Sequence, residues 1–316
     1  MKVICTSPSF AKYDKTPIED LQKHGFEYLS FPADVSLDEL KPHLSDTVAI
    51  IVAFTQINEL FLSLAPNLNI VCKHGVGVDN IDLAATQKHQ IWVTNVPNAN
   101  KHAVADFALT LLLGAARQLP QACAKTKKGE WPRIFATDAY GKTIGILGLG
   151  NIGKQVALRA KGFNMQILAY DPYPDLDFAK QHAIQFVSLD QLTEQSDFIS
   201  IHMPLIESTH HLFDLARIKT MKKSAFLLNL SRGGIVDERD LYHALSQNMI
   251  AGAASDVFVE EPLTSHPLFT LDNFIGTPHI AGYTDGAVSA IGTMCVQNII
   301  NTILNGKRPE NVVNGL

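Results

Sequence analysis

The sequence predicts an α/β protein built around two parallel β-sheets. Short runs rich in β-branched and aliphatic residues alternate with longer stretches of helical character, which is the rhythm of repeated βα units. These runs fall into two series, separated by the turn-forming stretch Asn95–Asn100. The 316 residues also exceed what a single hydrophobic core usually organises, so we expect two domains.

The first series predicts a small α/β domain. Its expected strands are Lys2–Cys5, Glu27–Phe31, Val48–Phe54, Leu68–Lys73 and Ile91–Val96. Pro97, directly after the last of them, is the expected first hinge between the domains.

The second series predicts a separate and larger sheet, preceded by a helix over Val104–Leu113. A final amphipathic helix is expected over Val288–Leu304, ending at Gly306. If that helix returns to the first domain, residues 1–97 and 284–316 form one domain and residues 98–283 the other. The expected strands of the larger sheet are Thr143–Leu149, Gln166–Tyr170, Phe198–His202, Ala225–Leu230, Ala251–Val257 and Phe274–Thr277.

Composition excludes several classes of function. The chain carries 26 basic and 31 acidic residues, a net charge of −5, and no basic run that would neutralise a nucleic-acid backbone. The four cysteines form no Cys-x-x-Cys pair, so neither a metal cluster nor a disulfide framework is expected. No apolar stretch approaches the roughly 20 residues of a membrane helix. We therefore expect a cytoplasmic protein that binds no metal, membrane or nucleic acid.

A glycine-rich turn follows the first strand of the larger sheet. The segment Gly148-Leu149-Gly150-Asn151-Ile152-Gly153 fits the G-x-G-x-x-G pattern between a buried strand and a helix. In this pattern the first glycine permits the tight turn, the second admits a pyrophosphate, and the third allows the helix to pack on the strand. The N–H groups at the helix start, from Asn151 and Ile152, favour the bound anion.

An acidic residue stands where a dinucleotide site needs one. The next strand, Gln166–Tyr170, ends at Asp171, the expected acceptor of hydrogen bonds from the adenosine ribose hydroxyls. The following residues supply no arginine or lysine for a 2′-phosphate, and Asp175 and Asp177 would repel one. These observations predict NAD as the cofactor.

Four further segments resemble the D-isomer-specific 2-hydroxyacid dehydrogenases, and most closely the phosphoglycerate dehydrogenases among them. The resemblance implies two Rossmann-like or flavodoxin-like domains, with the dinucleotide-binding domain inserted into the substrate domain. It also implies hydride transfer between NAD and a D-2-hydroxy acid or its 2-oxo acid. The segments are His74–Asp82, Asn229–Gly234, Asp256–Pro262 and Thr277–Ile280.

Three side chains in these segments suit the chemistry of 2-oxo acid reduction. The fork of Arg232 can grip carboxylate and carbonyl oxygens together. His279 can donate the proton in reduction and accept it in oxidation. A carboxylate beside such a histidine favours the imidazolium and orients the ring, the role that the resemblance gives Glu261 and not Glu260.

The resemblance implies further contacts. The backbone N–H groups of Val76 and Gly77 are expected to bind the substrate carboxylate, and Asp256 to lie near the nicotinamide carboxamide. Contacts to the cofactor are also expected from Met203, Leu230, Ser231, Arg232, His279 and Gly282.

The loop Val52–Asn58 departs from the phosphoglycerate dehydrogenase pattern, which places an arginine there for the substrate phosphate. This chain has no cation in the loop, and Phe54 favours a small or apolar substrate side chain. Lys73 or Lys101 remains a possible substitute. Both a phosphoglycerate-like substrate and an unphosphorylated one, such as D-lactate or hydroxypyruvate and glyoxylate, therefore stay open. Formate is disfavoured, because formate dehydrogenases carry glutamine at the position of Glu261.

Two questions lie beyond the substrate. A non-catalytic NAD-sensing protein, similar to the related transcriptional corepressors, is the alternative from another class of function. The resemblance also implies a homodimer, formed through the helix Val104–Leu113 and the segment Leu119–Tyr140 with Trp131 and Phe135.

Overall fold

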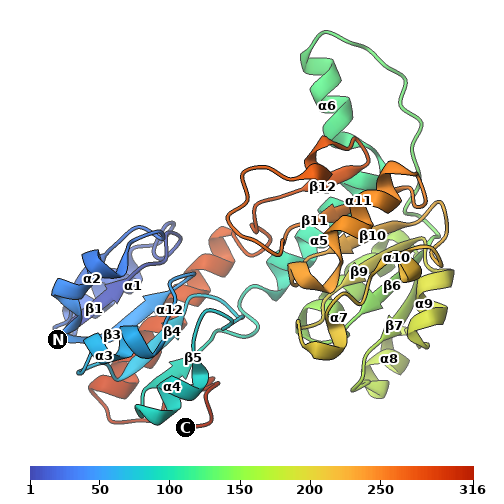
Figure 1. Ribbon diagram of the computed structural model, residues 1–316. Helices are drawn as coiled ribbons and strands as arrows, with labels where there is room; N and C mark the ends of the chain where they lie inside the picture. Colours follow the sequence, from blue (N-terminus) through green and yellow to red (C-terminus); the bar gives the residue numbers. More distant parts are fainter. The chain divides into compact units, whose positions relative to one another are not determined.

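The computed structural model describes all residues from Met1 to Leu316, and the chain divides into two compact units (Figure 1). The terminal unit comprises Met1–Asn100 and Tyr283–Leu316, and the central unit comprises Lys101–Gly282. The central unit is thus inserted between two parts of the terminal unit. The predicted fold class is confirmed.

The terminal unit contains a five-stranded sheet in the order β2-β1-β3-β4-β5, with every pair of strands parallel. This order places a topological switch point between β1 and β3, where the connections leave in opposite directions. The strands are β1 (Lys2–Cys5), β2 (Glu27–Ser30), β3 (Thr47–Val52), β4 (Ile70–Lys73) and β5 (Trp92–Thr94).

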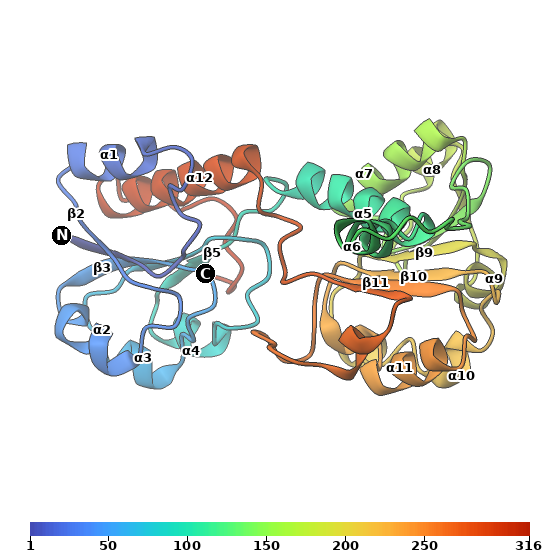
Figure 2. The ribbon, with the colours of Figure 1, turned by 90° about the horizontal axis from the view of Figure 1, so that it is seen from above.

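Helices cover both faces of this sheet (Figure 2). One face carries α1 (Thr16–Lys23) and α12 (Asp285–Ile303), and the other carries α2 (Leu37–Leu44), α3 (Glu59–Leu64) and α4 (Leu83–Lys88). Side-chain caps fix where the helices on the second face begin. Ser36 and Glu39 form a capping box at α2, Asn58 caps α3, and Asp82 accepts a 2.9 Å hydrogen bond from the amide of Ala85 in α4.

The final helix, α12, completes the core of the terminal unit. It begins three residues before the predicted start at Val288, because Thr284 caps it through the amide of Ala287 at 3.2 Å. Its apolar side chains, such as Ile291 and Ile299, pack with strand residues including Val3 and Ile70. The two ends of the chain therefore share one hydrophobic core.

The central unit contains a seven-stranded parallel sheet in the order β12-β11-β10-β9-β6-β7-β8. Its topological switch point lies between β9 and β6. The glycine-rich turn follows β6 at this point. The strands are β6 (Thr143–Leu147), β7 (Gln166–Tyr170), β8 (Gln185–Phe186), β9 (Phe198–Ile201), β10 (Phe226–Asn229), β11 (Gly252–Ser255) and β12 (Phe274–Gly276).

Helices cover both faces of this sheet (Figure 2), and each face has its own hydrophobic core. One face is covered by α5 (Lys101–Ala116), α7 (Asn151–Ala160) and α8 (Leu176–His182). The other is covered by α9 (Leu189–Gln195), α10 (Leu215–Ile218) and α11 (Glu238–Ser246). Because both faces are covered, the strands other than β8 are mainly apolar, and they were recognisable in the sequence as continuous runs.

The differences from the predicted elements have local causes. The strand predicted over Thr143–Leu149 stops at Leu147, because Gly148 adopts a left-handed conformation with φ +87°. The helix predicted over Val104–Leu113 runs from Lys101 to Ala116. The two-residue strand β8 was not predicted, since so short and partly exposed a strand has no distinctive pattern.

One part of the central unit buries almost none of its side chains in a hydrophobic core. Helix α6 (Leu119–Lys127) buries none of its residues, and it continues into an extended segment that runs to β6 (Figure 1). We call residues 117–142 the arm. No helix in the chain combines the length and the apolar character that crossing a membrane requires.

Candidate active site

The glycine-rich turn after β6 leaves no room for side chains at two of its three glycines. A Cβ atom on Gly148 would approach the carbonyl oxygen of His202, and one on Gly153 the carbonyl oxygen of Gly148, in both cases closer than the 3.0 Å that real Cβ atoms keep. Gly150, the N-cap residue of α7, has nothing within 4 Å of the corresponding position. Space is therefore open beside Gly150 at the N-terminus of α7, and this space suits a bound pyrophosphate.

The acid predicted to bind the adenosine ribose lies at this turn. One oxygen of Asp171 accepts the amide N–H of Leu149 at 2.8 Å, and the other accepts the amide of Tyr173 at 2.8 Å. Asp175 caps α8 and holds Lys154 in a 2.5 Å ion pair, so this nearby cation already has an anionic partner. The glycine-rich turn, the carboxylate of Asp171 and the open N-terminus of α7 together fit the adenosine half of NAD.

The segment after β10 is ordered by Asn229, for which the sequence indicated no role. Its side-chain oxygen accepts the amide and the hydroxyl of Ser231 at 3.1 and 3.0 Å, and its amide donates to the carbonyl of Arg232 at 2.8 Å. The guanidinium of Arg232 in turn donates to the Ser231 carbonyl at 2.7 Å. Met203 and Leu230 are both 7% exposed, so their side chains belong to the hydrophobic cores.

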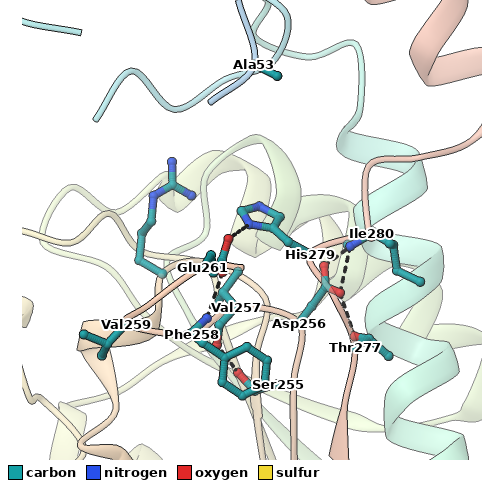
Figure 3. A network of polar contacts seen from close by, with 12 residues as sticks. Ala53, Ser255, Asp256, Val257, Phe258, Val259, Glu261, Thr277, His279 and Ile280 are labelled. Carbon is teal, nitrogen blue, oxygen red and sulfur yellow. Dashed lines mark hydrogen bonds and ion pairs between the residues drawn. The ribbon is translucent and has the colours of Figure 1, made fainter. Parts of the chain in front are cut away.

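The predicted acid/base pair is in direct contact (Figure 3). His279 Nδ1 lies 2.6 Å from one carboxylate oxygen of Glu261, and the amide of Phe258 donates to the other at 2.8 Å. Because an ionised carboxylate only accepts hydrogen bonds, Nδ1 carries the hydrogen of this contact. The ring is thereby fixed through Nδ1, and its Nε2 edge is the one turned away from Glu261.

Glu261 is ionised at neutral pH. Partial burial raises its pKa, but the hydrogen bond and charge of His279, the amide of Phe258 and the charge of Arg232 together outweigh that effect. The pKa of Glu261 therefore lies below its usual value. The charges of Arg232 and His279 thus both act on the carboxylate of Glu261.

Asp256 holds the turn that presents His279. Its side chain is almost fully buried and accepts the Thr277 hydroxyl at 2.6 Å, the Ile280 amide at 2.9 Å and the Ala281 amide at 2.8 Å (Figure 3). Burial raises the pKa of this carboxyl, although these hydrogen bonds and the charge of His279 act in the opposite direction. The backbone of His279 itself is left-handed, with φ +54°. Asp256 therefore stabilises a strained turn, a role the sequence did not indicate.

The predicted substrate residues lie at the carboxyl edge of the other sheet, in the terminal unit. The carbonyl of Val76 accepts the side-chain amide of Asn95 at 2.8 Å, and Gly77 follows it in the same loop. Phe54 is 48% exposed, and the ammonium of Lys73 lies 5.8 Å from its ring centroid.

Lys73 also joins two loops of the terminal unit. Its ammonium donates to the carbonyl of Ala53 and, at 2.6 Å, to Asn80, whose own amide donates to the Thr55 carbonyl at 2.6 Å. Lys101, the other cation considered for this role, begins α5 of the central unit, and Gly282 is the last residue of that unit. No group of three or more histidine, cysteine or acidic side chains could hold a metal ion.

Comparisons with known proteins identify the family to which the chain belongs. Residues 109–281 match the model of the D-isomer specific 2-hydroxyacid dehydrogenase NAD-binding domain. The chain is 42% identical over 281 residues to the D-3-phosphoglycerate dehydrogenase of Methanocaldococcus jannaschii, covering 88% of this chain and 53% of that protein. It therefore spans about half the length of this relative.

Two other relatives match along nearly their full length. The glyoxylate reductase of Korarchaeum cryptofilum is 39% identical over 90% of each chain. The structure of a D-lactate dehydrogenase from Aquifex aeolicus, complexed with NAD and lactic acid, superposes with a TM-score of 0.84 at 28% identity over 100% of both chains. The chain therefore belongs to the D-isomer specific 2-hydroxyacid dehydrogenases, a family of NAD-dependent oxidoreductases, and its central unit contains the NAD-binding domain.

Proposed function

We propose that the chain interconverts a small, unphosphorylated 2-oxo acid and its D-2-hydroxy acid, with the terminal unit as the substrate domain. The contact between Glu261 and His279 carries this proposal, because it is a paired acid/base in the same unit as the dinucleotide turn. NADH, when bound, supplies the hydride. The remaining steps depend on the side chains of the chain itself.

Each catalytic side chain has one task in this reaction. In reduction, His279 gives the proton on Nε2 to the carbonyl oxygen, and in oxidation it takes the proton back from the hydroxyl. Glu261 accepts the hydrogen on Nδ1 and thereby holds the ring in place. Arg232 grips the substrate carboxylate and polarises the carbonyl, so that negative charge forming on the oxygen is stabilised.

The terminal unit accounts for the preference against a phosphate. The backbone N–H groups of Val76 and Gly77 bind the carboxylate, and Phe54 offers an apolar surface to the substituent. Lys73 is already hydrogen-bonded to Asn80 and to a backbone carbonyl, which weakens it as a phosphate partner. A doubly charged group without a cation would be strongly disfavoured here.

The identity to D-3-phosphoglycerate dehydrogenase favours phosphohydroxypyruvate as the second candidate, and turnover measurements separate the two. We would follow NADH oxidation with pyruvate, glyoxylate, hydroxypyruvate, branched-chain oxo acids and phosphohydroxypyruvate. An unphosphorylated acid should have the highest kcat/KM. A preference for phosphohydroxypyruvate would overturn the assignment of Phe54.

The variant His279→Ala tests the acid/base itself. We expect kcat to fall by roughly two to four orders of magnitude while NADH binds as before. Unchanged turnover would refute the role of His279. Tight NADH binding by the unaltered protein without turnover of any acid would instead favour the NAD-sensing function.

We further propose that the arm pairs with a second copy of the chain to form a homodimer. Trp131 is 89% exposed and Phe135 87% exposed, which is unusual for large aromatic side chains on a monomer. A cavity of about 230 Å³ at the base of the arm is lined in part by Phe135, Ala116 and Ile275. Sedimentation at micromolar concentration should give a dimer, and Trp131→Ser should weaken it. A monomeric unaltered protein would contradict the pairing.

A cytoplasmic location is also proposed. Cys5, Cys72 and Cys295 are free thiols buried in the terminal unit, and Cys123 is a free thiol on the surface. Such unpaired thiols suit a reducing compartment. Recovery of the protein in the cytosolic fraction after cell lysis tests this assignment.

A further inference from the structure

A second carboxylate, Glu238, lies against the loop that carries Glu261. Glu238 is the first residue of α11, and only 17% of its side chain is exposed. Its Oε1 accepts the backbone N–H of Val259 at 2.8 Å, and its Oε2 lies 3.3 Å from Nε2 of His266. The chemistry proposed above assigns no task to either Glu238 or His266.

The peptide between Phe258 and Val259 is held by a second contact as well. A Cβ atom on Gly233 would overlap this peptide, at distances well under 3.0 Å from atoms of both residues. Gly233 directly follows Arg232 in the chain. The same peptide is thus packed against the backbone beside Arg232 and hydrogen-bonded to Glu238.

The hydrogen-bond pattern requires a carboxylate at position 238. The amide of Leu268 donates to Nδ1 of His266 at 3.3 Å, so the hydrogen of the neutral ring is on Nε2 and points to Glu238. Both oxygens of Glu238 therefore face donors. The His266 ring also packs near Phe258, with centroids 6.2 Å apart, which fixes it in place.

We propose that Glu238 is a positioning residue, which fixes the Phe258–Val259 peptide and thereby holds Glu261 against His279. The link is short, because the amide of Phe258 donates to one oxygen of Glu261 and the other oxygen contacts His279. Glu238 touches neither His279 nor any atom proposed to react. This inference rests on the proposed function and extends it to the support of the acid/base pair.

The variant Glu238→Gln tests the proposal with almost no change in shape. Glutamine has one acceptor and one donor group, so one of the N–H groups, of Val259 or of His266, must then face another donor. We expect kcat for oxo acid reduction to fall about ten-fold, with the KM for NADH unchanged.

The double variant separates positioning from general stability. In a Glu261→Gln background there is no charged partner left to position, so adding Glu238→Gln should change kcat by less than about two-fold. Equal and independent losses in the two backgrounds would overturn the proposal. Glu260→Gln is the matched control, since it removes one charge from the same loop, and it should behave as the unaltered protein does.

A spectroscopic measurement that needs no substrate turnover tests the inference independently of the proposed function. In protein labelled with ¹⁵N-histidine, the hydrogen on Nδ1 of His279 should give a strongly downfield resonance, because it lies in a 2.6 Å contact with Glu261. The resonance should shift or vanish in Glu238→Gln and persist in Glu260→Gln. If it persists in both, Glu238 does not position Glu261, whatever the substrate proves to be.

A variant at His266 serves if Glu238→Gln does not fold. His266→Phe keeps an aromatic ring beside Phe258 and removes the donor to Glu238, together with the acceptor of the Leu268 amide. We expect the same changes in kcat and in the resonance, of smaller size, because the bond from Val259 remains. A normal kcat together with a normal resonance would overturn the proposal.

Discussion

Two glycine-containing turns, one in each unit, follow parallel strands but are stabilised in different ways. The turn Gly148–Gly153 after β6 is shaped by close approach of backbone to backbone, which leaves no space for Cβ atoms at its ends. The turn Gly75–Gly77 after β4 is held by side chains around it. His74 is hydrogen-bonded to Ser7 at 3.0 Å, and Asn95 to the Val76 carbonyl at 2.8 Å. A turn shaped by close backbone contacts can be predicted from consecutive residues of the sequence. A turn supported by distant side chains cannot.

The largest effect is expected from Gly153→Ala. The new Cβ would overlap the carbonyl oxygen of Gly148, so either the turn or the start of α7 must move. We expect NADH binding to be lost and the free energy of unfolding to fall by about 3 kcal/mol. Binding titration by NADH fluorescence, with urea unfolding beside it, measures both.

Gly150→Ala is the matched control, because its Cβ meets nothing within 4 Å. Its free energy of unfolding should stay within about 1 kcal/mol of that of the unaltered protein, while NADH binds more weakly. If both variants were equally stable, the turn would not be held by backbone contact.

An intermediate effect is expected from His74→Phe in the other turn. Burial, with a smaller effect from the charge of Lys73, lowers the pKa of His74 from 6.5 to about 4. Between these values the unfolded chain binds a proton that the folded chain does not. The free energy of unfolding therefore decreases as the pH falls from 6.5 to 4, by up to about 3 kcal/mol from this residue.

The variant removes that titration and keeps a ring beside Phe10. Loss of the bond to Ser7 should cost about 1 kcal/mol at neutral pH. The decline of stability in acid should nevertheless be shallower than in the unaltered protein. Urea unfolding at neutral pH and near pH 4.5 tests this, and parallel declines in the two proteins would contradict it.

The smallest effect is expected from Asn95→Ala, which removes one exposed hydrogen bond to the loop of Val76. Stability should change by less than about 1 kcal/mol. The KM for the oxo acid should rise a few-fold, because the amides proposed to bind its carboxylate are then less well fixed, and NADH affinity should stay the same. A change in NADH affinity instead would show that the loop serves the cofactor.

The same contrast explains how much the sequence could predict. The strands β6 and β7, the turn after β6 and the acid at Asp171 follow one another within a single βαβ unit, so local pattern was enough to place them. The residues that support the site come from distant segments. Asp256 binds the turn around His279, and Glu238 binds Val259, each across about twenty residues.

No periodicity marks such long-range pairs. Glu238 looks like any acid in the first turn of a helix, next to the N-cap residue Asp237. The roles of Arg232, Glu261 and His279 came from chemistry and resemblance, and they remain predictions until the variants are measured. The contact between Glu261 and His279 is the geometric observation that now supports them.

The return of α12 to the terminal unit also determines the order in which the two units can be completed during synthesis. The central unit is continuous from Lys101 to Gly282, so all of its strands are synthesised before α12. The terminal sheet is synthesised before the central unit, yet one of its faces lacks Ile291, Val296 and Ile299 until the central unit has been made. The terminal unit is thus begun before the central unit but completes its core only after it, and part of one apolar face stays uncovered in the interval.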